Sequence, residues 1–456
     1  MQPIETILES QRARFAGGTT REPAFRRRQL DLLQAAIRRN ETAILEALHQ
    51  DLGKSSYEAY ITEVGLVLEE IAYLRANLRR LDRPRSVRTP MTLLPARSRV
   101  YREPYGVALI LSPWNYPFQL AMTPLAGALA AGNCAVLKLS DDAPHTSEVI
   151  KRLLAACFPE DYVAVRTGGR VENRSLLAQR FDTIFFTGSV PVGRFVMEQA
   201  AKHLTPVTLE LGGKSPCIVD ETADLELAAR RIVWGKFINA GQTCVAPDYL
   251  LVHESVRDRL TDLMRQCIRS FYGDQPHNNP QYPRIVSRRH FDRLLTLLGR
   301  GRIAHGGMSD ADSLRIEPTL LANVTWDDPV MQEEIFGPIL PVLTFRTLAE
   351  AEALIGSRPK PLALYLFTRS RANERHVIQH VSYGGGCVND TLLHLANPHM
   401  PFGGVGESGM GGYHGEASYR TFSREKSMLH GGGRMDNPLR YPHHWHRFKL
   451  MKRLMR

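Results

Sequence analysis

The sequence predicts an α/β protein built on two doubly wound parallel sheets. Short apolar runs alternate with helix-forming segments, and the runs lie at 107–111, 135–140, 183–187 and 207–211. The intervening helical segments lie near 120–131, 146–157 and 191–203. A second series follows, with a helix at 223–237, a strand at 249–253, a helix at 255–271 and a strand at 361–367. Buried strands separated by helices are typical of parallel sheets.

Other segments flank these two series. Residues 24–81 are predicted to be helical, because Leu30, Leu33 and Ile37 recur at helical spacing. Residues 83–104 are rich in Pro and Arg without a helical period, which predicts an extended linker or arm. The Gly-rich segments are expected to be loops, and they lie at 384–390 and 401–415.

The composition is that of an ordinary globular protein, with 43% hydrophobic and 23% charged residues among 456. That length predicts two or three domains. Residues 1–15 contain no apolar core of a signal peptide, and no run approaches the roughly 18 apolar residues of a membrane-spanning helix. The net charge of +11 suits an anionic partner, but a solvated basic exterior is the simpler interpretation. No motif that reads DNA or RNA accompanies this charge, so we expect no nucleic-acid partner.

Six cysteines are scattered singly along the chain, and only Cys244 lies in a turn, within GQTCVAPD at 241–248. None belongs to a CxxC pair or has histidines at zinc-ligand spacing, so we expect no metal. Scattered free cysteines suit a reducing compartment, which favours a cytoplasmic protein. Cys134 and Cys217 lie in apolar strand-like runs and Cys267 on an apolar helix face, as small buried side chains do.

Three side chains have surroundings that suit covalent catalysis at a carbonyl group. Cys244 is the candidate nucleophile. Glu210 lies in the apolar run VTLEL, where burial would raise its pKa toward that of a general base; a glutamate facing solvent at a strand edge is the alternative. Asn115 follows the first predicted strand, where its amide could donate to an oxyanion; a turn asparagine is the alternative.

A further set of residues is compatible with a dinucleotide. In FFTGSVPVGRFV (185–196) a strand leads through a turn into a helix whose N–H groups could bind phosphate, although a plain connection fits equally well. Lys138 lies at the carboxyl end of a predicted strand. It could bind a cofactor there, or its ammonium group could simply extend into water. Glu333 and Glu334 could accept from a ribose hydroxyl or could be loop charges. Taken together, nucleophile, base, amide and dinucleotide-type sheet predict carbonyl capture, hydride removal and hydrolysis.

In this combination the chain resembles the aldehyde dehydrogenase superfamily. The motifs PWNYP, FTGSxxxG, LELGGKSP, GQTC and EEIFGP occur in the family's order, over roughly residues 24–430. GQTCVAPDY, PFGGVGESGMGGYHG and the short N-terminus are most similar to the class 3 branch, which includes fatty and aromatic aldehyde dehydrogenases. The resemblance implies an NAD(P)-binding domain at 1–82 and 102–210 and a catalytic domain at 211–395. It also implies a bridging, subunit-pairing segment at 83–101 and 396–456.

The resemblance further implies roles for individual residues. Cys244 would attack the aldehyde, Asn115 and the N–H of Cys244 would hold the oxyanion, and Glu210 would activate the water that hydrolyses the thioester. The residues implied for the cofactor are Lys138, Asp141, Gly188, Ser189, Gly193, Leu211, Glu334 and Phe336. Those implied for the substrate pocket are Tyr116, Trp234 and Thr243.

The expected reaction is NAD(P)-dependent oxidation of a medium- or long-chain aliphatic or aromatic aldehyde to the acid. Relatives that pass the acyl group to coenzyme A or phosphate tend to lack the base, so Glu210 favours hydrolysis. Relatives usually have Glu three residues after the lysine, where this chain has Asp141. A carboxylate repels a 2′-phosphate, and the shorter one repels it less, so we expect NAD with NADP tolerated. The alternatives are an acyl-transferring reductase relative and a non-enzymatic basic binding protein.

The tail at 437–456 is the other distinctive feature. Trp445, Phe448, Met451 and Met455 recur near helical spacing among arginines and lysines. A basic helix resting on an anionic membrane is one interpretation; a disordered basic end or a dimer contact is the other. By family analogy, the arm at 83–104 and the tail would join in a homodimer.

Overall fold

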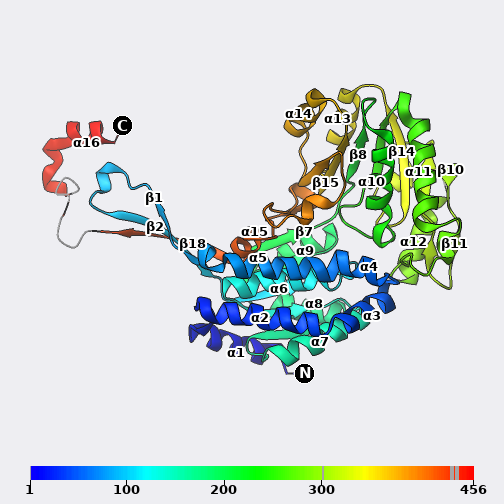
Figure 1. Ribbon diagram of the computed structural model, residues 1–456. Helices are drawn as coiled ribbons and strands as arrows, with labels where there is room; N and C mark the ends of the chain where they lie inside the picture. The colour runs from blue at the N-terminus through cyan, green and yellow to red at the C-terminus, as the bar shows by residue number, and fades with distance from the viewer. Residues whose placement is uncertain (1, 300–301, 432–435, 437–440, 456) are drawn as a thin grey trace.

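The computed structural model describes residues 2–299, 302–431, 436 and 441–455, apart from the side chains at 444 and 454 (Figure 1). One lobe combines the N-terminal helices with the first parallel sheet, and a second lobe surrounds the other parallel sheet. A narrow antiparallel arm projects from the first lobe, away from the second. The mixed α/β fold predicted from the sequence is therefore confirmed.

The N-terminal helices form a layer that carries the first lobe. They are α1 (Ile4–Ala16), α2 (Pro23–Arg39), α3 (Glu41–Leu52), α4 (Ser56–Ala59) and α5 (Gly65–Asp82), with a π-helical turn at Tyr60–Val64. Leu30, Leu33 and Ile37 of α2 are fully buried, because their spacing places them on one face. The helical prediction for 24–81 is confirmed, whereas the preceding helix α1 was not predicted.

The first sheet has six strands in the order β17-β7-β6-β3-β4-β5. Its strands are β3 (Val107–Leu111), β4 (Cys134–Lys138), β5 (Val163–Arg166), β6 (Thr183–Thr187), β7 (Val207–Glu210) and β17 (Gly409–Met410). The connecting helices are α6 (Gln119–Ala131), α7 (Pro144–Cys157), α8 (Arg170–Ala178) and α9 (Val190–Ala201). Every pair is parallel except β17 with β7, which places a late segment of the chain beside the strand of Glu210.

The second sheet has seven strands in the order β10-β13-β14-β9-β8-β15-β16. Its strands are β8 (Pro216–Val219), β9 (Tyr249–His253), β10 (Arg302–His305), β13 (Thr319–Ala322), β14 (Ile339–Phe345), β15 (Ala363–Phe367) and β16 (Gly385–Val388). Its helices are α10 (Leu225–Phe237), α11 (Arg257–Tyr272), α12 (Arg288–Leu298), α13 (Leu348–Gly356) and α14 (Arg371–His380). A small hairpin joins β11 (Ser309–Asp310) to β12 (Arg315–Ile316). Apart from the antiparallel edge strand β10, the seven strands run parallel.

The arm is a three-stranded antiparallel ribbon of β1 (Arg85–Val87), β2 (Arg97–Pro104) and β18 (Ser423–His430). Helix α15 (Glu416–Thr421) leads from the first lobe into β18. The tail forms a 3-10 turn at Pro442–Arg447 and helix α16 (Phe448–Leu454), which lies apart from both lobes (Figure 1). The arm predicted from the Pro- and Arg-rich segment is confirmed.

One local prediction is wrong. We expected 384–390 to be a loop because it contains three successive glycines, but Gly385–Val388 forms the edge strand β16, paired with β15. A side chain at Gly386 would lie 3.0 Å from the carbonyl carbon of Leu364, so glycine serves close strand packing here rather than a turn.

Candidate active site

The loop that carries Cys244 is shaped by a left-handed turn. After α10, the 3-10 segment Ile238–Gly241 places Asn239 at φ 52°, Ala240 at φ 50° and Gly241 at φ 74°. A Cβ at Gly241 would lie 2.5 Å from the carbonyl carbon of Gly337, so only glycine fits there. The turn directs the chain back across the site, so that the half-buried Cys244 opens onto a cavity.

Hydrogen bonds fix the loop before Cys244. The side-chain N–H group of Gln242 donates to the carbonyls of Asn239 and Arg284, at 3.0 Å in both cases. Its side-chain oxygen accepts from the N–H of Val286, also at 3.0 Å. Asn115 lies against the same loop, because its Nδ2 donates to the carbonyl of Gln242 at 3.0 Å. The side chain of Asn239 donates in turn to the carbonyl of Asn115 at 2.8 Å. Residues more than 120 positions apart in sequence therefore form one unit.

Glu210 ends β7 and is only 3% exposed, so the interpretation as a solvent-facing strand-edge residue is wrong. Neither of its carboxylate oxygens has a hydrogen-bond partner among the described residues. Burial without such partners raises the pKa of Glu210 well above its ordinary value. Burial also raises the pKa of the Cys244 thiol, and the negative charges of Glu334 and Glu210 raise it further. The two carboxylates therefore lie close enough to Cys244 to influence its ionisation.

A cavity of about 220 Å³ lies beside Cys244. Tyr116, Trp234 and Thr243, the residues expected in the substrate pocket, all line it. The Tyr116 hydroxyl and Thr243 Oγ1 lie 2.7 Å apart and share a hydrogen bond. The wall is mostly apolar and contains no lysine, arginine, aspartate or glutamate among the described residues.

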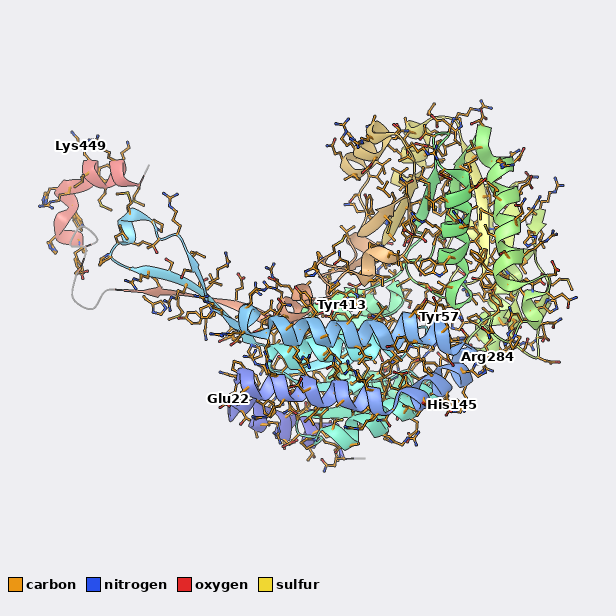
Figure 2. All side chains as sticks on the ribbon, in the orientation of Figure 1. Glu22, Tyr57, His145, Arg284, Tyr413 and Lys449 are labelled. Carbon is orange, nitrogen blue, oxygen red and sulfur yellow. The ribbon has the colours of Figure 1, made fainter. Side chains whose placement is uncertain are left out.

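Sequence reasoning missed most of this wall. Several other segments supply the rest, including Ile61 and Thr62 from the π-helical turn, Leu392 and Leu393 after β16, and Phe402, Tyr413 and His414 near β17. Figure 2 shows Tyr413 at the junction of the two lobes. The Gly-rich pattern at 401–415 indicated a close approach of the backbone to something, whereas Ile61 carries no signal beyond a helical period.

On the first sheet, the predicted cofactor residues lie at or beyond the carboxyl ends of β4, β6 and β7. Lys138 ends β4 and is 6% exposed, and burial lowers its pKa. Its Nζ lies 3.8 Å from Oδ1 of Asp141, which accepts from the N–H of Gly168 at 2.9 Å. The alternative of a lysine that reaches water is wrong for Lys138. The predicted positions 138 and 141 thus form one charged pair at this sheet edge.

Helix α9 begins at the end of β6, which lies between β7 and β3 in the sheet. Ser189 precedes its first residue, and the N–H of Gly188 donates to the carbonyl of Glu210 at 3.0 Å. A Cβ at Gly193 would lie 2.6 Å from Cδ2 of Leu211, so glycine lets the helix approach β7 closely. The N-terminus of α9 therefore lies next to the strand end of Glu210, and the first N–H groups of a helix have no partner within the helix itself.

Glu334 and Phe336 reach the site from the second lobe. Lys214 anchors the segment that carries Glu334 and Phe336, because it forms an ion pair with Asp248 at 2.5 Å and donates to the carbonyl of Glu333 at 3.0 Å. Burial raises the pKa of the Glu334 carboxyl to about 8, with the charge of Asp248 acting in the same direction. Phe336 adopts φ 50° and packs edge-on against Trp114, with ring centroids 5.4 Å apart.

The residues fit a dinucleotide. Thr187 Oγ1, Lys236 Nζ and both Glu210 oxygens are buried without a hydrogen-bond partner in the described chain, which is the state expected of groups that face a bound polar ligand. A Cβ at Gly212 would lie 2.6 Å from Cδ of Glu334, so glycine at this position leaves room for the Glu334 carboxylate. Among the described residues, no group of three or more His, Cys, Asp or Glu is placed to hold a metal ion. None of the described helices has the length and apolarity needed to cross a membrane.

Comparisons with known proteins show the family of the chain. The model of the aldehyde dehydrogenase family matches residues 2–428. The 4,4'-diaponeurosporen-aldehyde dehydrogenase of Staphylococcus aureus is 49% identical over 99% of both chains. Aldehyde dehydrogenase family 3 member B1 of Mus musculus is 44% identical over 97% of this chain and 95% of its own.

Solved structures give the same result. The substrate-bound state of Staphylococcus aureus AldH superposes with a TM-score of 0.98 at 49% identity, over 100% of both chains. An NAD-dependent aldehyde dehydrogenase from Sinorhizobium meliloti has a TM-score of 0.86 at 29% identity, over 95% of this chain and 88% of its own. The chain therefore belongs to the aldehyde dehydrogenase family, and it is an oxidoreductase that acts on aldehydes.

Proposed function

We propose that the protein oxidises apolar aldehydes to carboxylic acids with NAD, through a thioester on Cys244. The observation that carries the proposal has three parts: the Asn115 amide lies against the loop of Cys244, the charge of Glu210 acts on the Cys244 thiol, and Cys244 opens onto an apolar cavity. The thiolate of Cys244 attacks the aldehyde carbon, and its own N–H and the amide of Asn115 stabilise the oxyanion. Loss of hydride from this thiohemiacetal leaves the thioester. Glu210 then takes a proton from water, whose oxygen attacks the thioester, and the acid leaves while Cys244 departs as the thiolate.

The nicotinamide of bound NAD supplies the hydride acceptor for this reaction. Lys138 would hold the adenosine ribose, and Glu334 the nicotinamide ribose. The start of α9, with Gly188, Ser189 and Gly193, would lie along the pyrophosphate, as N–H groups at a helix N-terminus favour anions. Leu211 and Phe336 would pack against the cofactor from the two lobes.

Two variants test the chemistry, with NADH formation followed in the absence of coenzyme A. Cys244→Ser should abolish turnover. Glu210→Gln should give a burst of about one NADH per site and then slow by about 10²- to 10⁴-fold, because acylation survives and hydrolysis does not. Glu198→Gln, an exposed residue of α9, is the matched control. Turnover that survives in Cys244→Ser would refute the mechanism, and turnover that requires coenzyme A would indicate acyl transfer instead.

The cofactor preference rests on Asp141. Its carboxylate is held beside Lys138 by the N–H of Gly168, where it opposes a 2′-phosphate on the adenosine ribose. We therefore propose NAD as the main cofactor, with NADP tolerated. Asp141→Glu should raise the ratio of kcat/KM for NAD to that for NADP. An unchanged ratio would remove this explanation.

The substrate class follows from the cavity. Its apolar wall suits a medium- or long-chain aliphatic or an aromatic aldehyde. Among the described residues, the wall has no charged side chain that would bind a polar aldehyde. The relative named for 4,4'-diaponeurosporen-aldehyde is in keeping with this class. A series of straight-chain aldehydes and benzaldehyde tests it, and kcat/KM should rise with chain length. A preference for acetaldehyde or for charged aldehydes would contradict the proposal.

We also propose that residues 1–82 and 102–210 form the NAD-binding domain, that 211–395 form the catalytic domain, and that the arm pairs two subunits. In the structure, the segment after 395 also contributes β17 to the first sheet. The ribbon exposes Met428 and Leu429 on β18, which a second copy would cover. Light scattering should give the mass of a dimer, and a monomeric mass at all concentrations would refute the pairing.

The tail is a candidate contact for an anionic membrane. Trp445, Phe448 and Met455 are at least 70% exposed, and Lys449 is exposed on the same helix, away from both lobes (Figure 2). Such a basic and apolar helix suits a lipid surface. Vesicles of phosphatidylglycerol should float the whole protein but not a version that ends at Tyr441. Equal flotation of both would leave the tail as a dimer contact or a solvated end.

A further inference from the structure

The segment 54–63 lies between the two lobes and contacts the site through buried polar groups. Lys54 and Glu63 form an ion pair of 2.5 Å in which both side chains are fully buried. Figure 2 shows Tyr57 of this segment near Arg284 of the second lobe, where the helical layer meets the second lobe. The segment includes a π-helical turn, a feature frequent at functional sites.

The ion pair holds the turn that carries Asn115. Glu63 Oε2 accepts from the N–H of Phe118 at 2.9 Å and of Gln119 at 3.2 Å, at the start of α6. Lys54 Nζ donates to the carbonyl of Asn115 at 3.3 Å and lies 4.0 Å from the centre of the Tyr116 ring. The main chain at Asn115 and just after it is thus held from one segment.

Glu58 holds the other half of the site. Its Oε1 accepts from the N–H of Asn239 at 2.8 Å, in the left-handed turn before Cys244. The left-handed backbone conformation costs about 1–3 kcal/mol for each non-glycine residue and persists only where neighbouring groups hold it. Nδ2 of Asn239 donates both to the carbonyl of Asn115 at 2.8 Å and to the carbonyl of Gln242 at 3.1 Å. A displacement of Asn239 would therefore move both proposed oxyanion donors.

We infer that Glu58 is a positioning residue for the oxyanion site, acting through Asn239 on Asn115 and on the N–H of Cys244. The Lys54–Glu63 pair acts on the other half of the site, the turn that carries Asn115. This inference rests on the proposed function of Cys244. It predicts that Glu58 matters for steps that build negative charge on a carbonyl oxygen and not for the nucleophilicity of the thiol itself.

Two reagents separate these effects. Acylation by p-nitrophenyl acetate passes through an oxyanion, whereas alkylation by iodoacetamide displaces iodide at a saturated carbon and forms none. In Glu58→Ala the acylation rate should fall about 10- to 100-fold, as misplacement of a donor by a fraction of an ångström does. The alkylation rate of Cys244 should stay near that of the wild type. Glu58→Gln keeps an acceptor oxygen and should restore most of the acylation rate.

The pH profile gives a second readout. Burial raises the pKa of Glu58 to about 7, while the charge of Lys54 and the N–H of Asn239 lower it and Glu63 raises it. Tyr116, Tyr272 and Tyr282 also face this carboxyl, and each stays neutral because its own pKa is raised. The carboxylate is the stronger acceptor, so the ratio of wild-type to Glu58→Gln acylation rates should rise as pH passes about 7.

The controls make each outcome decisive. Glu69→Ala alters an exposed residue of α5 and should leave both rates unchanged. Equal losses of acylation and alkylation in Glu58→Ala would mean a merely structural role, and no loss of either would also overturn the inference. If the wild type itself shows no Cys244-dependent burst with p-nitrophenyl acetate, the proposed nucleophile fails rather than the role of Glu58. Thermal unfolding of each variant confirms that the compared proteins are folded.

Discussion

Gly212→Ala should weaken cofactor binding without weakening the fold. A Cβ at residue 212 would lie 2.6 Å from Cδ of Glu334 and 2.7 Å from its Oε1, closer than real Cβ atoms come to any atom. The clash is with the end of a flexible side chain, so the carboxylate moves and the backbone stays. Residue 212 has no positive φ, and Ala there restricts the unfolded chain, which contributes about 0.4–1 kcal/mol in favour of folding.

The magnitude follows from the hydrogen bonds that Glu334 would lose. Above about pH 8 the Glu334 carboxyl is ionised, and a hydrogen bond to a charged group contributes about 1.5–3 kcal/mol, which corresponds to about 10- to 150-fold in binding. The KM for NAD should rise by that factor at saturating aldehyde, and quenching of tryptophan fluorescence by NAD should show the same shift in Kd. The melting temperature should stay constant or rise slightly.

The matched control is Gly356→Ala, where an added Cβ meets no atom within 4 Å. It should change neither the KM for NAD nor the Kd. If Gly212→Ala binds NAD as tightly as the control does, Glu334 does not hold the nicotinamide ribose. If the variant loses stability instead, the steric reasoning about the flexible carboxylate is wrong.

Three further predictions concern the thiol, the buried ion pair and the cavity. Iodoacetamide should alkylate Cys244 ever faster from about pH 8 to about pH 10, because the raised pKa keeps the thiol protonated at neutral pH; a plateau below pH 8 would contradict this. Lys54→Met should lower the free energy of unfolding by about 3–5 kcal/mol in urea, since Glu63 is left buried without its partner. Arg75→Met, which breaks an exposed pair with Asp31, should cost below about 1 kcal/mol, and equal losses would show that burial is not the cause. Ile61→Ala should raise the KM for a long-chain aldehyde about fourfold for each methyl or methylene group that no longer contacts the substrate, at about 0.8 kcal/mol per group, and leave the KM for acetaldehyde unchanged; Ile378→Ala, on an exposed face of α14, is the control.

The sequence predicted those parts of the fold that have a local pattern. Buried parallel strands such as 107–111 and 183–187 are continuous apolar runs, and helix α2 repeats its apolar residues at helical spacing. The short strands β5 and β13 and the helices α12 to α14 were missed. The stability of such short strands depends on neighbours in the sheet, which one segment of sequence does not record. Helix α12, by contrast, repeats Phe291, Leu294 and Leu297 at helical spacing and was predictable from the sequence.

The same distinction applies to the site. Asn115, Glu210 and Cys244 stand in short motifs, and the structure brings them together; their roles stay predictions. Ile61 and Glu58 were not singled out, because each lies on a helix whose local pattern is satisfied without the site. Only the fold shows that the turn at 60–64 faces the cavity while Glu58 reaches Asn239.

The pairing of β17 with β7 also sets the order in which the site can be completed during synthesis. Glu210 lies opposite Gly409 in that pair, and Tyr413 and His414 close the cavity just beyond it. Cys244 leaves the ribosome long before any of these late residues exists. A chain stopped short of them carries a thiol that water reaches and a base at an unpaired strand edge. Premature termination near the end of the message would therefore yield a reactive but incompetent protein rather than a slightly weaker enzyme.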